Sequence, residues 1–230
     1  MDSSDALSSW HQKCHVIPLG IDPYNQQQTS SGDMKTANRL WNGAEARVLC
    51  IARLSYYKGL PDLLNAARYL RNTRIVIVGT GEQKNELHRL AEDEDITEKI
   101  AFVDECEEPL KAVLLDTCTC LCLPSIERTE AFGMALLEAM AHAKPTVICD
   151  IPGSGTGWVV QDGETGYIVP MQRPRELAHA IDKLTSDPSK ARAMGQAGRQ
   201  RLESEFSIHG VATRINEIYN RISQDAQEEL

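Results

Sequence analysis

The feature that most constrains this chain is a regular alternation of short β-rich runs with runs of helical spacing. Apolar runs at 47–54, 74–79, 99–104, 119–124 and 145–150 predict strands, and the segments 59–70, 82–93, 108–116 and 135–143 between them predict helices. Strands that are apolar on both faces and separated by helices of about 10–15 residues are typical of a parallel sheet covered on both sides. The sequence therefore predicts a doubly wound α/β domain.

The two ends of the chain differ from this central pattern. Residues 166–170 predict one more short strand, and the chain from Pro174 onward predicts extra C-terminal helices at 174–187, 188–206 and 208–222. Asn25 to Asn42 is polar, rich in Gln, Ser and Thr and without a period, which predicts a mobile excursion. We expect three segments: a crossing segment with a mobile polar loop (1–45), a Rossmann-like domain (46–205) and a C-terminal helix (206–230).

Charge and hydropathy exclude several classes of protein. The 24 basic and 33 acidic residues give a formal net charge of −9, which argues against a nucleic-acid binder and against electrostatic attachment to anionic lipid. No run of about 18 apolar residues occurs, and "MDSSDALSSW" has neither the basic nor the apolar region of a signal peptide. We expect a cytoplasmic protein without direct membrane insertion.

The seven cysteines are predicted to be reduced. Five of them lie in apolar, strand-like runs, where thiols pack as small hydrophobes: Cys50, Cys118, Cys120, Cys122 and Cys149. On a strand, the three thiols of "CTCLC" would point to one face. Neither a CxxC pair nor a nearby His completes a zinc set, so packing is the favoured interpretation and no metal is expected.

Candidate site residues follow the predicted strands, because an open parallel sheet binds ligands at the carboxyl ends of its strands. Arg53 and Lys58 follow the first strand, Gly79 follows the second, and "PSIERTEAFG" with Glu130 follows the fourth. After the fifth comes "IPGSGTGW", whose glycines allow backbone to approach a ligand.

Three common nucleotide and hydrolase motifs do not fit. Gly79-Thr80-Gly81 lacks the third glycine of the dinucleotide fingerprint and follows the second strand, so a nicotinamide site is unsupported. No GxxxxGK[ST] loop occurs, and the GxSxG elbow is present only as a fragment at Gly153-Ser154-Gly155.

Taken together, the segments resemble a known family. "IARLSYYKGLPDLLNAA", "RIVIVGTGEQKNEL", "IAFVDE", "CLPSIERTEAFGMALLEAMAHAKPTVICD" and "DGETGYIVP" follow one another as in the nucleotide-binding half of GT-B glycosyltransferases, specifically the retaining group 1 or family four type. The resemblance covers residues 16–206, and its most specific part is the E-x7-E spacing from Glu130 to Glu138. It implies the Rossmann-like half of the GT-B fold.

The resemblance implies roles for the two carboxylates and the two cations. Glu130 would contact hydroxyls of the donor sugar, and Glu138 would accept hydrogen bonds from the ribose, since a carboxylate offers two acceptor oxygens to a diol. Arg53 and Lys58 would neutralise the departing diphosphate in place of a metal ion. No metal and no cofactor besides the nucleoside diphosphate sugar, of GDP or UDP type, is implied.

The remaining implied contacts are to phosphate and nucleoside. The amides of Phe132 and Gly133 open a helix and would suit a phosphate. The nucleoside side would involve Gly79, the backbone of Cys106, and the side chains of Glu108 and Lys111. Two positions depart from the family: Asp104 replaces a glycine, and "IPGSGTGW" replaces the commoner Gly-Gly-x-x-Glu loop.

The resemblance implies a donor-binding half that moves a hexose, with retention, onto a glycan or lipid-linked acceptor. It is most similar to bacterial surface-polysaccharide transferases such as mannosyltransferases. The acceptor would be held by an N-terminal half absent from this sequence, toward which the helix at 208–222 would reach, so the isolated chain is expected to be incomplete for catalysis. The full-length protein is expected to be peripheral at the inner membrane.

Two other functions stay open at this point. One is a GT-B sugar-nucleotide epimerase, which would need carboxylates and a histidine from the other half. The other is a regulatory or scaffolding module that keeps the fold without turnover. Nucleotide titration discriminates the module from the enzyme.

Overall fold

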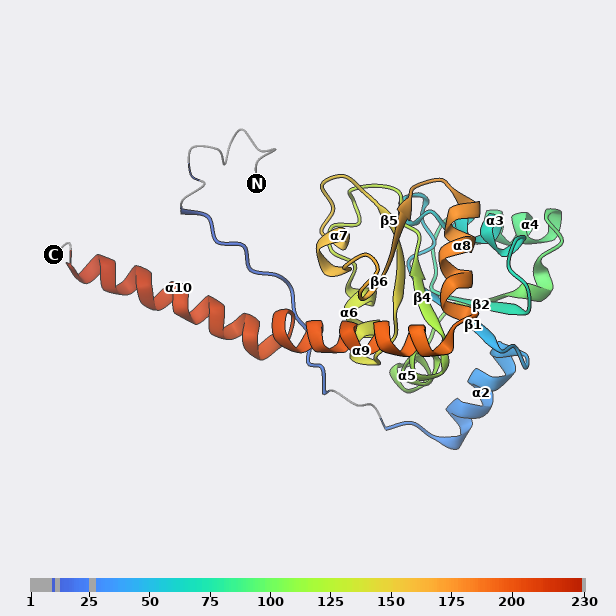
Figure 1. Cartoon of the computed structure of the whole chain (residues 1–230), viewed down its shortest axis with the longest axis horizontal. Helices are drawn as coiled ribbons and strands as arrows, with labels where there is room; N and C mark the ends of the chain where they lie inside the picture. The colour runs from blue at the N-terminus through green and yellow to red at the C-terminus, as the bar shows by residue number, and fades with distance from the viewer. Residues whose placement is uncertain (1–9, 11–12, 25–27, 229–230) are drawn as a thin grey trace.

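A single parallel sheet organises the chain (Figure 1). The computed structural model describes residue 10, residues 13–24 and residues 28–228. The strands are β1 (Ala46–Ile51), β2 (Thr73–Val78), β3 (Ile100–Val103), β4 (Cys120–Leu123), β5 (Thr146–Asp150) and β6 (Gly166–Pro170). They lie in the order β3-β2-β1-β4-β5-β6, and every pair of neighbours is parallel. The predicted doubly wound α/β class is confirmed.

Helices cover both faces of this sheet. On one face α3 (Leu60–Ala67) packs against α4 (Lys84–Asp93) and α8 (Pro174–Thr185). On the other, α2 (Ser31–Trp41) packs against α5 (Glu108–Thr117), and α6 (Met134–Ala141) packs against α9 (Pro188–Glu205). Helices lie on both faces because each crossover between parallel strands is right-handed. From β1 the chain adds β2 and β3 on one side of the sheet and β4 and β5 on the other, so the connecting helices fall on opposite faces. Short turns η2 (Tyr56–Lys58), η3 (Thr97–Lys99) and α7 (Thr156–Val159) complete this part.

The five cysteines predicted to pack in the core do so. Cys50, Cys118, Cys120, Cys122 and Cys149 are buried free thiols, and burial raises the pKa of Cys50 and of Cys149 to about 12. Cys118 differs from the prediction, because it precedes β4 and its Sγ contacts the carbonyl oxygen of Leu115 at 3.2 Å. Only two of the three thiols of "CTCLC" therefore belong to the strand, since the helix before it ends at residue 117.

The prediction of a mobile excursion at 25–42 was wrong for most of that segment, where α2 forms; residues 25–27 lie outside the described residues. A capping box begins the helix: Ser30 Oγ accepts from the Asp33 amide at 3.2 Å, and the Asp33 carboxylate accepts from the Ser30 amide at 2.8 Å. Ala37 and Trp41 are fully buried, and Trp41 Nε1 donates to Thr117 Oγ1 at 2.9 Å. The polar composition reflects the exposed face of a packed helix.

The chain before α2 and the chain after α9, called here the first and second crossing segments, are hydrogen-bonded to each other. The Ile21 amide donates to the Phe206 carbonyl at 3.0 Å, and the Ile208 amide donates to the Ile21 carbonyl at 2.9 Å. A Cβ at Gly20 would lie 2.7 Å from the Phe206 carbonyl oxygen, so this approach requires glycine. Residues 13–21 and the described chain after Phe206 therefore leave the sheet domain at one place.

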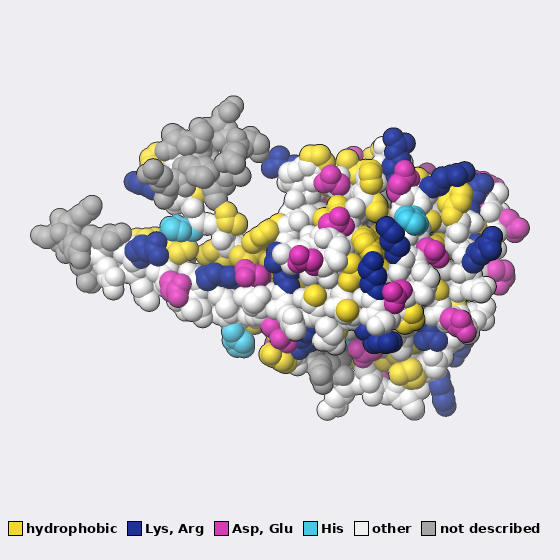
Figure 2. Space-filling model, viewed as in Figure 1, with side chains coloured by type: hydrophobic (Ala, Val, Ile, Leu, Met, Phe, Trp, Pro, Cys, Tyr) yellow, Lys and Arg dark blue, Asp and Glu magenta, His cyan; other side chains and the backbone are white. Residues whose placement is uncertain are grey.

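The predicted C-terminal helix is present as α10 (Ile208–Glu228), which extends away from the sheet domain (Figure 1). Ile215, Tyr219 and Ile222 are exposed on it, and hydrophobic side chains are visible along the protruding part of the molecule in Figure 2. In the described part of the chain, no helix is both long and apolar enough to cross a membrane.

Candidate functional site

The strand order reverses at β1, whose neighbours are β2 and β4, so the loops after β1 and β4 flank a topological switch point. These loops are bonded together: the Ile126 amide donates to the Tyr57 carbonyl at 2.8 Å. Gly59 has a φ of 61°, and a Cβ there would lie 2.2 Å from the Pro124 carbonyl oxygen. This close approach carries Lys58, at the end of η2, to the loop that contains Glu130.

Lys58 and Glu130, both predicted site residues, form a buried ion pair. Lys58 Nζ donates to Glu130 Oε2 at 2.5 Å, and Ser125 Oγ donates to the same oxygen at 2.7 Å. The side chains of Lys58 and Glu130 are only 12% and 8% exposed, and the ammonium lies 5.0 Å from the centre of the Tyr57 ring. The two hydrogen bonds, one of them from a cation, replace contacts to water that the carboxylate loses at this depth.

Ser125 was missed by the sequence reasoning, although it stands in the quoted "PSIERTEAFG" run. It is 1% exposed and follows β4 by two residues. A serine after a proline is usually a turn residue, so no spacing rule marks it as a partner of Glu130. The contact depends on how the loop folds back after the strand.

The loop after β5 holds the backbone next to Glu130. Ser154 Oγ donates to the Glu130 carbonyl, and the Gly155 amide donates to the Ala131 carbonyl at 2.8 Å. A Cβ at Gly155 would lie 2.6 Å from that Ala131 oxygen. The glycines of "IPGSGTGW" were expected to let backbone approach a ligand; at Gly155 the close neighbour is instead the protein's own backbone.

The start of α6, whose N-cap Gly133 follows Glu130 by three residues in the sequence, offers backbone amide groups. Gly133 caps the helix with a φ of 79°, and no backbone hydrogen bond within the described residues uses the N–H of Phe132 or Gly133. The Phe132 ring packs edge-on against Trp158 and Phe206, with ring centres 6.3 and 5.9 Å away. Free N–H groups at a helix start favour an anion, and a phosphate contact at these two positions stays a prediction.

In the described structure, neither Arg53 nor Gly79 forms a hydrogen bond or an ion pair with Lys58 or Glu130. The Arg53 side chain is 72% exposed, and its one ion pair within the described residues is with Glu82, at 3.9 Å. Gly79 follows β2 with a φ of 144°, and a Cβ there would lie 2.0 Å from the Ala52 carbonyl oxygen. The packing of the loops after β1 and β2 is therefore enough to explain why Gly79 is a glycine.

A second polar cluster joins Glu138 of α6 to α5. Lys111 Nζ donates to Glu138 Oε1 at 3.1 Å and to Glu108 Oε1 at 2.8 Å. Burial lowers the pKa of Lys111, but Glu108 and Glu138 outweigh that effect and the pKa is raised. Nearby, desolvation raises the pKa of Cys106 to about 11, although Lys111 opposes the shift. The predicted nucleoside residues Lys111 and Glu138 are thus brought together.

A cavity of about 180 Å³ lies beside this cluster. Its walls come from α5, α6 and the first crossing segment: Ile21, Asp22, Glu108, Lys111, Ala112, Leu115, Glu138, Ala141 and His142. Apolar side chains form part of the lining and three carboxylates, one ammonium and one imidazole form the rest. The cavity can therefore accept a group that is apolar on its faces and polar on its edges.

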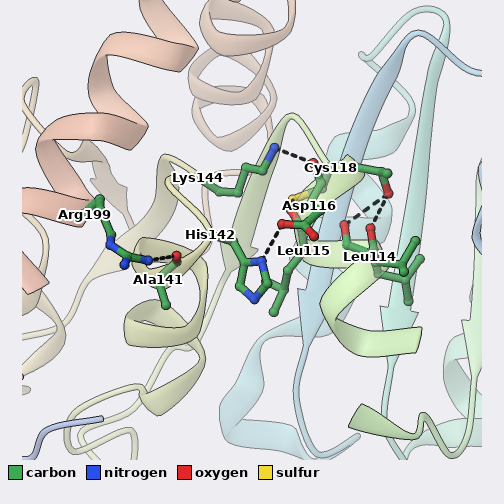
Figure 3. A network of polar contacts seen from close by, with 10 residues as sticks. Leu114, Leu115, Asp116, Cys118, Ala141, His142, Lys144 and Arg199 are labelled. Atoms are coloured by element: carbon green, nitrogen blue, oxygen red, sulfur yellow. Dashed lines mark hydrogen bonds and ion pairs between the residues drawn. The ribbon is translucent and has the colours of Figure 1, made fainter. Parts of the chain in front are cut away.

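Contacts at the far ends of α5 and α6 fix the two helices to each other (Figure 3). His142 Nδ1 lies 2.6 Å from Asp116 Oδ1, and Lys144 Nζ donates to the Asp116 carbonyl at 2.7 Å. Arg199 of α9 donates to the Ala141 carbonyl. These contacts hold the two helices that supply Lys111 and Glu138.

The sequence matches a known protein family. Residues 34–201, more than half of the chain, match the family described as glycosyl transferases group 1. The chain belongs to this family. As a group 1 glycosyl transferase chain, it is 31% identical over 215 residues to O-antigen chain mannosyltransferase C from Escherichia coli, covering 93% of this chain and 56% of that protein.

A second curated relative and a solved structure are also similar to this chain. The D-rhamnosyltransferase WbpZ from Pseudomonas aeruginosa is 31% identical over 212 residues, covering 89% of this chain and 52% of WbpZ. The structure of Anabaena HepE in complex with UDP superimposes with a TM-score of 0.78 at 23% identity, over 90% of this chain and 57% of HepE, which shows a shared fold. This glycosyl transferase chain spans about half the length of the curated relatives it matches. The predicted family and fold are confirmed.

Proposed function

We propose that this chain is the donor-binding part of a retaining glycosyltransferase that moves a hexose from a nucleoside diphosphate sugar to a glycan or lipid-linked acceptor. The observation that carries the proposal is the buried Lys58–Glu130 pair at the switch point, next to the amides that begin α6. Family membership supports it, as do relatives named mannosyltransferase and D-rhamnosyltransferase. Because these relatives are transferases, they favour this function over a sugar-nucleotide epimerase.

The sugar and the diphosphate would meet different groups. Glu130 accepts hydrogen bonds from sugar hydroxyls, while the amides of Phe132 and Gly133 face the phosphates. Lys58, beside Glu130, and the exposed Arg53 supply positive charge as the diphosphate leaves. Preorganised charge in a site from which water is excluded stabilises such a developing anion strongly.

No divalent metal is needed in this proposal. Glu130 Oε2 already accepts hydrogen bonds from Lys58 and Ser125. Glu138 Oε1 likewise accepts from Lys111. The ammonium groups therefore neutralise negative charge where a metal would otherwise be required.

The nucleoside would lie on the side of Glu138 and the adjoining cavity. Glu138 accepts hydrogen bonds from the ribose hydroxyls, and the hydrogen bond from Lys111 orients its carboxylate. The cavity, with apolar walls and polar edges, fits part of a base or ribose. Anabaena HepE has the same fold and its structure holds UDP, which supports a nucleoside diphosphate as the ligand.

The acceptor and the remaining catalytic groups would come from a further N-terminal half, toward which the exposed apolar residues of α10 would face. The complete protein would act in the cytoplasm, at the inner surface of the membrane that carries its acceptor. Alone, this chain would bind donor yet transfer almost nothing, because proximity and orientation contribute about 7–11 kcal/mol to such reactions.

Calorimetric titration of the chain with UDP, GDP, ADP and their hexose derivatives tests the proposal. We expect micromolar binding of one diphosphate and its sugar, unchanged by a chelator. No binding of any of these compounds at millimolar concentration would overturn the proposal in favour of a non-catalytic module. Binding that disappears with the chelator would overturn the metal-free part alone.

A further inference from the structure

We propose that Ser125 is a positioning residue that holds the Glu130 carboxylate so that Oε1 is the oxygen presented to the donor sugar. The proposal deepens the function given above and rests on it. It starts from an asymmetry in how the two carboxylate oxygens of Glu130 are used.

Within the described residues, every hydrogen bond to the Glu130 carboxylate ends on Oε2. Lys58 Nζ and Ser125 Oγ both donate to that atom, at 2.5 and 2.7 Å. A carboxylate has about four acceptor positions, two on each oxygen. Two donors on one oxygen saturate it and leave both acceptor positions of Oε1 for a ligand.

Hydrogen bonds hold the main chain of Glu130 in place. Ser154 Oγ donates to the Glu130 carbonyl, and the Glu130 amide donates to the Glu127 carbonyl at 3.0 Å. With the main chain held, the orientation of the carboxylate depends on side-chain rotation alone. The two donors on Oε2 restrict that rotation.

Ser125 and Lys58 are not equivalent as restraints. Lys58 is a long, cationic side chain from the loop after β1, and in the proposed function its ammonium is also attracted to the diphosphate. Ser125 is short, neutral and 1% exposed, and it lies in the same loop as Glu130. A diphosphate can draw Lys58 away from Glu130, whereas the Ser125 hydrogen bond stays. Ser125 therefore keeps Oε1 oriented while the phosphates are bound.

Ser55 provides the contrast needed for a test. It is also buried, in the loop after β1, and its hydroxyl has no hydrogen-bond partner in the described structure. Ser55→Ala is therefore the same chemical change at a similar depth without a contact to Glu130. A general effect of losing a buried hydroxyl would appear in both variants.

The experiment measures, for each protein, the ratio between the affinity for a nucleotide sugar and that for its diphosphate. The probes are UDP with UDP-glucose and GDP with GDP-mannose, used with the unmodified chain, Ser125→Ala, Ser125→Cys and Ser55→Ala. For Ser125→Ala we expect this ratio to fall about tenfold, the effect of a hydrogen bond to a charged group, while the affinity for the diphosphate stays unchanged. Ser125→Cys, a weaker donor of similar size, should give a smaller loss and serves if the alanine variant does not fold. Ser55→Ala should keep the original ratio.

The outcomes separate this proposal from the function on which it rests. An unchanged ratio in Ser125→Ala, an equal loss for both ligands, or the same loss in Ser55→Ala would overturn the positioning role alone. The positioning role would also be overturned if the unmodified chain bound the sugar nucleotide no more tightly than the diphosphate. Absence of all nucleotide binding would overturn the donor-site function as well.

Discussion

Removing the Lys58 ammonium should destabilise the fold as well as the site. Lys58→Met keeps most of the aliphatic side chain but leaves the Glu130 carboxylate, 8% exposed, with Ser125 as its remaining donor. Breaking a buried pair by removing one partner typically costs about 3–5 kcal/mol. Since Ser125 still donates and the carboxylate keeps slight access to water, we expect a loss of about 2–4 kcal/mol in the free energy of unfolding.

Urea unfolding followed by circular dichroism measures this loss, and the melting temperature should fall by about 2–4 °C for each kcal/mol in a domain of this size. The double variant Lys58→Met with Glu130→Gln also removes the buried carboxylate charge that Lys58→Met leaves without its cation, and it should recover most of the lost stability. Strict additivity of the two single changes would refute the reasoning, because it would mean that the two side chains do not interact. So would a loss below about 0.5 kcal/mol in Lys58→Met, which is the range of ordinary surface substitutions.

The remaining predictions concern the nucleoside side, the exposed cation and α2. Glu138→Gln should weaken diphosphate binding by about 1.5–3 kcal/mol in calorimetry, with little change in melting temperature. The matched control Glu217→Gln, at an exposed position, should change neither quantity. Equal effects of the two variants would contradict the ribose role of Glu138. Arg53→Ala should lower affinity for the diphosphate much more than for the nucleoside, and equal losses would exclude a phosphate contact. Ser30→Ala should cost about 0.5–2 kcal/mol of stability in urea unfolding by removing the cap of α2, and no loss would show that the capping box does not contribute.

The central sheet could be predicted because its signal is local. Each strand from β1 to β5 is apolar on both faces, and the helices between them have the usual spacing, so the order of elements follows directly. The helix α2 was missed because only one narrow face of it is buried. Ala37 and Trp41 are fully buried on that face, and the capping residues Ser30 and Asp33 look like loop residues in sequence.

The site could be predicted only in part. The switch-point rule brings the loops after β1 and β4 together, and with them Lys58 and Glu130. Which cation pairs with the carboxylate depends on how closely the two loops approach, and that distance is set by Gly59 against Pro124. Sequence spacing treats Arg53 and Lys58 alike, whereas folding buries one and leaves the other in solvent.

The backbone hydrogen bonds between Ile21 and Phe206 connect two parts of the site to the chain outside the sheet domain. Ile21 lines the cavity beside Glu138, and the ring of Phe206 packs on Phe132 just before α6. A pull on the chain before Gly20 or along α10 is therefore transmitted through the same backbone hydrogen bonds to both places. A displacement at this single crossing would therefore reach the cavity beside Glu138 and the amide end of α6 together.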